Sequence, residues 1–410
     1  MRYMTGAALI AGALACGEES QTTQPLETRA AVAAATGYQV EKFASLGGTV
    51  SRGMAINPSG VVAGWTTEED GSRRAALWRS TEPLDLGTLG GPGSSSMVPW
   101  PGLNSAGMVV GISHTDDIDP LGEQWSCEEG GFLPETNRAC RGFVWETGTM
   151  RELPTLGGVH GFATGINDRG EIVGWAETAV IDPTCDLTTT QRRQFRAAIW
   201  HPKRGSDEKI KVRELRPFGN DSTSAATAIN NEGQAVGISG RCDQAVGRFS
   251  AQHAVLWEKN GKPREIPNLG GTTWHTPMDI NDRGDVVGFS NPAGPGDPDG
   301  EFIAQAFLWT YGAPVATNIG TLGNDPVSQA HAINAHGQVV GVSFGTPGVG
   351  SRAFIYENGV LTDLNDLIDS EDVFLSAQDI NDAGQITGRL LDAVTGETLM
   401  FVATPVGASP

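Results

Sequence analysis

The residues of this chain with the clearest chemical potential are aromatic, histidine and acidic side chains in its loop-rich segments. A tryptophan ring can stack on a sugar ring, while nearby carboxylates accept hydrogen bonds from the sugar hydroxyl groups. Each such residue could equally fill a junction in a protein core, so position must decide between the two roles. The candidates for ligand binding are Trp100, His160, Trp274, His275, His331, Asp116 and Asp117.

A short acidic segment offers a second kind of chemistry. Asp297, Asp299 and Glu301 occupy alternate positions in Asp-Pro-Asp-Gly-Glu, and oxygen ligands at this spacing suit Ca²⁺. The segment lacks the twelve-residue EF-hand pattern, so a solvated acidic turn is the favoured interpretation and calcium the alternative. We expect no other cofactor, because the chain contains no Cys-x-x-Cys pair and no phosphate-binding loop.

No catalytic residues can be assigned from the sequence. A glycosidase would need two converging carboxylates, and the only acids that recur near the repeat described below are Asp279 and Asp379. Five of the seven repeats carry Ala or Gly at that position, which argues against a paired acid site. Loop carboxylates such as Asp117 remain an open alternative.

Composition limits the class of protein. The chain has 410 residues, of which 55 are glycine, and its formal net charge is −20. A hydrophobic content of 39% excludes an intrinsically disordered chain. The acidity disfavours binding to nucleic acids or anionic membranes, both of which need a cationic face.

An internal repeat predicts the strands and turns that must position the candidate residues. The pattern Asn-x-x-Gly-x-x-x-Gly occurs seven times, at spacings of 47, 63, 63, 51, 53 and 47 residues. A Leu-Gly-Gly-like element precedes most copies, and a short apolar run ending in an aromatic residue follows them. The repeats begin at Asn57, Asn104, Asn167, Asn230, Asn281, Asn334 and Asn381.

Each repeat predicts four antiparallel strands. The Asn-x-x-Gly element suits a tight hairpin turn, and units of roughly 50 residues with four strands are typical of β-propeller blades. We therefore predict an all-β, seven-bladed β-propeller over residues 37–404, followed by a tail at 405–410. An isolated strand at 38–46 would join the last blade and close the ring, whereas an open solenoid would need capping units.

The repeat resembles the HAF repeat family of extracellular bacterial proteins. The resemblance covers residues 38–404 and depends on Ala-Ile-Asn-x-x-Gly-x-x-Val-Gly at 228–237 and 332–341, Ala-Phe-Leu-Trp at 306–309 and Leu-Gly-Thr-Leu-Gly-Gly at 86–91. The His-Ala-Phe triplet of the family survives here only as His253-Ala254-Val255. The resemblance implies export and a repeat β fold, but no established reaction.

The N-terminal segment and the cysteines indicate an exported protein. Residues 1–16 resemble a lipoprotein signal peptide that ends at Cys16, the expected lipidation site, although an ordinary cleaved signal is the alternative. Residues 17–36 read as a flexible tether. Four cysteines remain, and their positions in the insertions predict two disulfides, Cys127 with Cys140 and Cys185 with Cys242.

Variable loops on a fixed scaffold usually hold the binding site. The insertions, at 66–73, 112–140, 175–195, 238–250, 289–304 and 342–351, all connect a second strand to a third and so share one face, called here the insertion face. The Asn-x-x-Gly turns occupy the opposite, turn face. We therefore predict a monomeric, lipid-anchored or extracellular binding module for a carbohydrate or protein. The alternatives are a polysaccharide hydrolase or lyase that uses loop carboxylates, and a structural envelope protein without a ligand.

Overall fold

The computed structural model describes residues 37–123, 127, 132–185, 190–203, 208–242, 251–296, 301–346, 348 and 350–407. Apart from one short 3₁₀ helix, η4 (Leu364–Leu367), the regular elements of this part are strands. None of its helices is long and apolar enough to cross a membrane. The predictions for the signal segment, for Cys16 and for the tether fall outside the described residues, as do Asp297 and Asp299.

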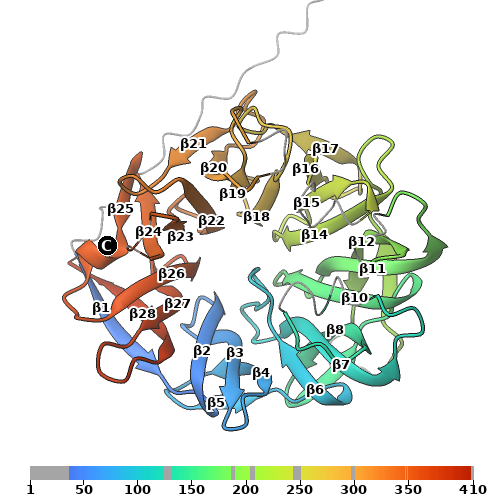
Figure 1. Ribbon diagram of the computed structural model, residues 1–410, viewed down its shortest axis with the longest axis horizontal. Helices are drawn as coiled ribbons and strands as arrows, with labels where there is room; N and C mark the ends of the chain where they lie inside the picture. The colour runs from blue at the N-terminus through green and yellow to red at the C-terminus, as the bar shows by residue number, and fades with distance from the viewer. Residues whose placement is uncertain are drawn as a thin grey trace, which may run out of the picture. The chain divides into compact units, whose positions relative to one another are not determined.

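The strands form four-stranded antiparallel meanders arranged around a common centre (Figure 1). Five of the meanders, blades 2 to 6, are separate sheets. Blade 2 consists of β6 (Gly90–Ser96), β7 (Val109–Ile118), β8 (Arg138–Glu146) and β9 (Thr149–Glu152); blade 3 of β10 (Gly157–Ile166), β11 (Ile172–Ile181), β12 (Arg193–His201) and β13 (Lys211–Glu214); blade 4 of β14 (Thr223–Ile229), β15 (Ala235–Gly240), β16 (His253–Trp257) and β17 (Pro263–Ile266). Blade 5 consists of β18 (Thr276–Ile280), β19 (Val286–Ser290), β20 (Gln305–Trp309) and β21 (Thr317–Gly320); blade 6 of β22 (Val327–Ile333), β23 (Val339–Phe344), β24 (Arg352–Glu357) and β25 (Val360–Asp363).

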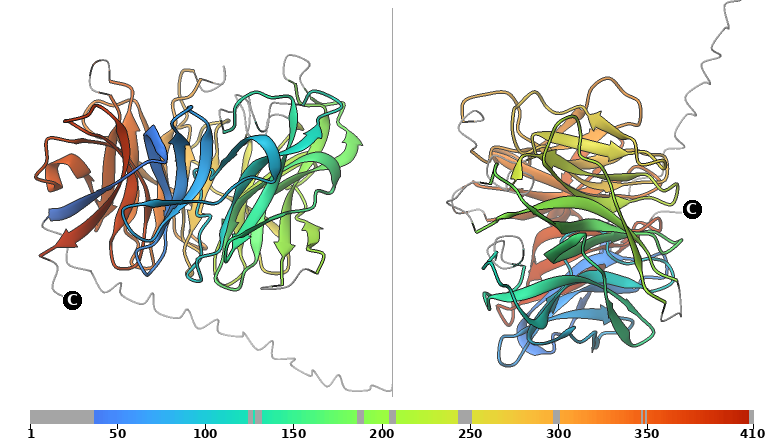
Figure 2. Two further views of the ribbon diagram at one scale, coloured as in Figure 1. Left: turned by 90° about the horizontal axis from the view of Figure 1, so that it is seen from below. Right: turned by 90° about the vertical axis from the view of Figure 1, so that its right-hand side faces the viewer.

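The remaining eight-stranded sheet contains two more meanders. Blade 1 consists of β2 (Gly47–Ile56), β3 (Val62–Glu68), β4 (Arg73–Trp78) and β5 (Pro83–Asp85); blade 7 of β26 (Val373–Ile380), β27 (Ile386–Leu391), β28 (Thr398–Val406) and β1 (Gly37–Phe43). A single parallel bridge between Val50 and Thr398 joins the two. The all-β propeller prediction is therefore confirmed, and Figure 2 shows the loops gathered at the two ends of the strands.

The ring closes through its terminal strands, as the isolated N-terminal strand predicts. Strand β1 pairs antiparallel with β28, from Gly37 opposite Val406 to Phe43 opposite Met400. Strand β28 ends at Val406, the partner of Gly37, and so runs two residues beyond the propeller boundary expected at residue 404. Lys42 of β1 also forms salt bridges with Asp372 and Asp392 of blade 7. Closure covers an edge of β28 that would otherwise present unpaired backbone groups.

The repeat asparagine serves its own turn and the next blade at once. In blade 4, Oδ1 of Asn230 accepts hydrogen bonds from the backbone N–H groups of Glu232 and Gln234, while Nδ2 donates to the carbonyl oxygen of Asn281 at 3.0 Å. Equivalent bonds occur at all seven copies, and the interblade bonds run from each asparagine to the next around the ring.

The two repeat glycines are required for different reasons, as blade 3 illustrates. Gly170 has a φ of 77°, a left-handed conformation that glycine adopts without strain and that the hairpin needs. A Cβ atom at Gly174 would lie only 2.1 Å from the carbonyl oxygen of Phe162, on the neighbouring strand. The second glycine therefore permits the close approach of the two innermost strands, next to a register shift in β10.

Tryptophans at the ends of the third strands anchor the packing between units. Their rings are fully buried, and each indole N–H donates to a backbone carbonyl, as Trp200 does to Pro154 at 2.8 Å. The anchoring residues are Trp78, Trp200, Trp257 and Trp309.

Both predicted disulfides are present. Cys127–Cys140 staples one insertion of blade 2, and Cys185–Cys242 links insertions of blades 3 and 4. Their Cα–Cα distances are 6.3 and 4.8 Å. Disulfides are consistent with an exported protein.

One innermost strand departs from the repeat. In blade 2, β6 ends at Ser96 and the chain up to Asn104 lies outside the strand. Pro99 and Pro101 cannot donate to a strand ladder, and the segment turns on itself through bonds from Trp100 N–H to Val98 and from Gly102 N–H to Trp100. Gln378 of blade 7 donates to the carbonyl oxygen of Pro99 at 3.1 Å, so this segment reaches across the centre of the ring.

Candidate functional site

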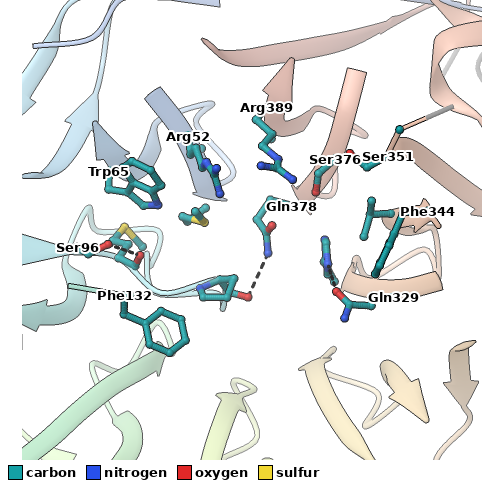
Figure 3. Close-up of a pocket in the computed structure, with 18 of the residues that line it drawn as sticks. Arg52, Trp65, Ser96, Phe132, Gln329, Phe344, Ser351, Ser376, Gln378 and Arg389 are labelled. Atoms are coloured by element: carbon teal, nitrogen blue, oxygen red, sulfur yellow. Dashed lines mark hydrogen bonds between the residues drawn. The ribbon is translucent and has the colours of Figure 1, made fainter. Parts of the chain in front are cut away.

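A cavity of about 880 Å³ lies at the centre of the ring, between blades 6, 7, 1 and 2. We call it the axial cavity. Its walls come from first and second strands of the blades and from Arg73 of β4. Phe132 and residues 344–346, 348, 350 and 351 reach it from insertions, so it belongs to the insertion face. Figure 3 shows the polar and aromatic side chains that point into it. Cavities of this size accept small organic ligands.

A second cavity of about 230 Å³ adjoins the first on the side of blades 3, 4 and 5. We call it the aromatic chamber, since Trp100, Trp175, Trp274 and Phe289 line it. The two cavities share lining residues, among them Pro99, the residue that Gln378 binds. The segment around Pro99 therefore stands between a polar compartment and an apolar one.

The lining residues fall at fixed offsets from the repeat asparagine. Residues five and three positions before it line one or both cavities in most blades, for example Gln329 and His331 before Asn334. The residue directly after the second glycine does the same, and it is apolar in six repeats and arginine in the seventh: Trp65, Ile112, Trp175, Ile238, Phe289, Val342 and Arg389. These offsets, applied to all seven copies, would have found most of the lining from the sequence.

The charged side chains of the axial cavity are arginines. Arg52 lies on β2, Arg73 begins β4 and Arg389 lies on β27, and no Asp or Glu occurs among the described lining residues. Burial and the like charges of Arg389 and Arg73 lower the pKa of Arg52 to about 10. Burial also lowers the pKa of Arg73 and of Arg389. The cavity is thus cationic within an acidic protein.

Trp65 supports two of these arginines. The guanidinium carbon of Arg73 lies 4.1 Å from the centre of its ring, and that of Arg52 lies 4.9 Å away. Arg73 also donates to the carbonyl oxygen of Phe132. A tryptophan face attracts cations, so the ring offsets part of the repulsion between the two guanidinium groups.

His331 is a neutral, buried group on the wall between the two cavities. Burial lowers its pKa to about 4. Its Nδ1 lies 2.8 Å from the carbonyl oxygen of Ala377, which can only accept. The single ring proton therefore resides on Nδ1, and Nε2, left as an acceptor, lies 3.4 Å from Oε1 of Gln329, which also only accepts and so makes no hydrogen bond with it.

Three of the residues predicted to bind ligand lie together here: Trp100, Trp274 and His331. The indole N–H of Trp100 is buried and has no hydrogen-bond partner among the described residues. Trp274 holds a left-handed backbone conformation, with φ at 60°, and its ring packs edge-on against Phe302 at 4.9 Å. Strain of this kind concentrates at functional sites.

The other two predicted histidines lie in the interior and serve neighbouring segments. His160 accepts from the backbone N–H of Cys140 at 3.2 Å, and its Nε2 lies 3.3 Å from Asp119. His275 contacts Ser290 and Asn268 at 2.8 and 3.1 Å. Neither residue lines the axial cavity or the aromatic chamber.

The predicted acidic ligand groups lie outside both cavities. Asp116 and Asp117 are exposed on β7, where the backbone of Asp116 accepts a bond from Arg138. Glu301 is also exposed, and its backbone N–H donates to the carbonyl oxygen of Gly296 at 3.0 Å. Of the proposed calcium ligands it alone is described, so the structure gives that site no test.

Cys127, Cys140 and His160 have ligand atoms within 4.8 Å of one another. Both sulfur atoms belong to the disulfide, so neither can act as a thiolate ligand. The grouping is therefore a structural junction and not a metal site.

The two axial carboxylates serve as backbone acceptors. Asp279 accepts from the N–H of Ile333 at 2.9 Å, and Asp379 from that of Ile56 at 2.7 Å, each across a blade boundary. Burial raises the pKa of Asp279 to about 6, and burial with the charge of Asp279 raises that of Asp379 to about 7. Neither lines a described cavity.

The stretch Gly341-Val-Ser-Phe-Gly345 has the spacing of a hydrolase nucleophile elbow. Ser343 lies within strand β23, is fully buried, and donates to Asp325 at 2.9 Å. A nucleophile elbow needs a sharp strand-to-helix turn that exposes the serine, and this position offers neither.

Comparison with known proteins finds only solved structures of low similarity. No family model matches the chain, and no curated protein does. Among solved structures, an oligogalacturonate lyase in complex with manganese has 11% identity and a TM-score of 0.43, over 90% of this chain and 96% of that one. Dipeptidyl peptidase 4 of Porphyromonas gingivalis has 12% identity, a TM-score of 0.40 and coverages of 86% and 52%. Trypanosoma rangeli sialidase in complex with sialic acid has 9% identity and a TM-score of 0.33, over 89% of this chain and 60% of that one. Similarities this low carry no argument about ligand or activity.

Proposed function

We propose that the protein is an exported binding module that takes a carbohydrate into the axial cavity on the insertion face. The observation that supports this most is the axial cavity itself, whose wall mixes aromatic rings with hydroxyl and amide side chains. Such a wall matches a sugar, which has apolar ring faces and hydroxyl groups at its edges. The aromatic chamber beside it would receive a less polar part of the same ligand.

The chemistry of the lining favours binding over hydrolysis. A glycosidase acts through two carboxyl groups that flank the scissile bond, and the described lining of the axial cavity contains none. The exposed acids Asp116 and Asp117, which the structure places on strand β7 and not in a loop, lie elsewhere. An enzyme that uses those acids remains the alternative, and it predicts turnover that Asp117→Ala abolishes.

A glycan array probed with purified protein tests the proposal. We expect binding to a subset of glycans, loss of that binding in Gln329→Ala with Phe344→Ala, and unchanged binding in Asp116→Ala with Asp117→Ala. The two pairs compare the cavity with the loop surface. Binding that follows the loop pair, or no binding to any glycan, would overturn the assignment of the cavity as a carbohydrate site.

Anchoring through Cys16 is proposed separately. Metabolic labelling with a radioactive fatty acid should mark the full-length protein, and Cys16→Ala should abolish the label. Labelling that persists in the variant would contradict lipidation at this position.

A further inference from the structure

Among the residues that the structure describes, Arg52 and Arg389 lack the nearby carboxylate that balances the charge of seven other arginines of the protein. Seven arginines lie at N···O distances of 2.5 to 3.4 Å from a carboxylate: Arg74, Arg141, Arg169, Arg193, Arg196, Arg283 and Arg352. No such carboxylate is present for Arg52 or Arg389 within the part of the chain that the structure describes. The Nε atom of Arg52 is buried and has no hydrogen-bond partner there.

These two arginines come from neighbouring blades and face the same space. Figure 3 shows both guanidinium groups turned into the axial cavity, with Gln378 beside them. Arg73 adds a third positive charge to the wall. Placing like charges together and away from water is unfavourable unless a counter-charge is bound. The arrangement is therefore best balanced when an anion occupies the cavity.

The positions are exceptional within the repeat. Arg389 follows the second glycine of its repeat, where the other six copies carry Trp, Ile, Phe or Val. Arg52 lies five residues before Asn57, where the other copies carry uncharged residues. Blade geometry thus does not require a charge at either place.

We propose that the ligand is an acidic saccharide, whose carboxylate or sulfate group binds between Arg52 and Arg389 while its sugar ring lies toward Phe132 and Phe344. This inference rests on the proposed carbohydrate-binding function. A guanidinium group matches planar oxyanions because it offers parallel N–H donors in a fixed fork. Ser376 and Gln378, on the same wall, supply neutral hydrogen-bonding groups for the sugar.

Isothermal titration with matched disaccharides tests the inference. The probes are cellobiouronic acid, cellobiose, and cellobiose sulfated at one primary hydroxyl. They differ in charge but share one carbon skeleton. We expect binding of at least one charged probe, no measurable binding of cellobiose, and weaker binding as salt is raised. The stronger of the two charged probes identifies the oxyanion.

Variants separate recognition from folding. Arg389→Gln and Arg52→Gln should each weaken binding of the charged probe by roughly ten-fold or more, and Arg389→Lys should restore only part of it, because lysine lacks the fork. The ligand-free melting temperature should stay unchanged or rise, since each change removes one of several like charges that are half-buried together. Arg213→Gln, at an exposed position on β13, is the matched control and should bind normally.

The outcomes test the acidic nature of the ligand separately from carbohydrate binding, the function on which it rests. Equal binding of cellobiose and the charged probes, or full binding in Arg52→Gln with Arg389→Gln, would overturn the acidic ligand and leave carbohydrate binding intact. Melting temperatures that fall in both glutamine variants would assign the arginines to structure instead. Failure of every glycan on the array and of all three probes would overturn both proposals.

Discussion

The side-chain amide of Asn381 donates a hydrogen bond of 3.0 Å to the carbonyl oxygen of Asn57, although the two residues are 324 positions apart in the chain. Six equivalent bonds link the other repeat asparagines in chain order. The bond from Asn381 therefore completes a ring of seven. The same residue that shapes each hairpin thus also registers each blade against the next.

Replacing one member of this ring should destabilise the whole protein. Asn230→Ala leaves the N–H groups of Glu232 and Gln234 and the carbonyl oxygen of Asn281 without their described partner. Unsatisfied groups of this kind cost about 1–3 kcal/mol each when buried, so we expect a loss of roughly 2–4 kcal/mol. Urea unfolding measures it. The control Asn260→Ala, in an exposed turn, should change stability by less than about 0.5 kcal/mol.

Removing strand β1 should open the ring. Without residues 37–43, the edge of β28 loses its antiparallel partner, and the buried rings of Tyr38 and Phe43 no longer cover it. Exposed strand edges pair with other chains, so we expect a lower melting temperature and association in light scattering. Glu41→Ala, an exposed position in the same strand, should leave the protein monomeric. A truncated protein as stable as the full chain would show that closure does not depend on β1.

The contribution of Asp379 to the stability of the protein should fall as pH rises from about 4 to about 7. Burial and Asp279 raise the pKa of Asp379 to about 7, above the ordinary carboxyl value of about 4. Between these values the folded state holds more protons than the unfolded state, so ionisation favours unfolding. Asp379→Asn cannot ionise. Its stability relative to the wild type should therefore rise from pH 4 to pH 7 and then level off, in urea titrations at several pH values. A difference that does not change with pH would contradict the raised pKa.

The disulfide between blades, Cys185–Cys242, should contribute more to the free energy of unfolding than Cys127–Cys140, which lies within one insertion. Cys185–Cys242 closes a segment of 57 residues and Cys127–Cys140 one of 13, and longer closed segments lose more chain entropy on cross-linking. Cys185→Ala with Cys242→Ala should lower stability by about 2–4 kcal/mol in calorimetry, and the other pair by less. The reverse order would show that native-state packing outweighs chain entropy here.

The architecture was predictable because blade geometry imposes itself on the sequence seven times. A left-handed turn position selects glycine at Gly170 and its equivalents, and close strand approach selects glycine at Gly174 and its equivalents. The asparagine is selected by three backbone bonds at once. Because each blade needs the same turn, the same strand spacing and the same backbone bonds, the same residues recur in all seven repeats and can be recognised in a single sequence.

The site was only partly predictable, because it is built where the repeat is broken. Trp100 and His331 attract notice by residue type and lie at the cavities. Arg52 and Arg389 do not, since 28 basic residues occur in the chain and nothing local marks these two. The overall negative charge of the chain gives no hint of the arginines: the described acids Asp116 and Asp117 are exposed, while the charged side chains that line the axial cavity are arginines. Aligning the repeats and looking for charge at apolar positions would have found both arginines.

Strand pairing between the two ends of the propeller has a consequence for how the protein reaches its native state. The partners Gly37 and Val406 are 369 residues apart, and contacts this distant in sequence form late, because most of the chain's entropy must be lost first. A chain that emerges from its N-terminus exposes β1 first and can pair it only after β28 has followed. The last folding step is therefore tied to completion of the chain, and an incomplete chain keeps an open edge that a chaperone or a protease can recognise.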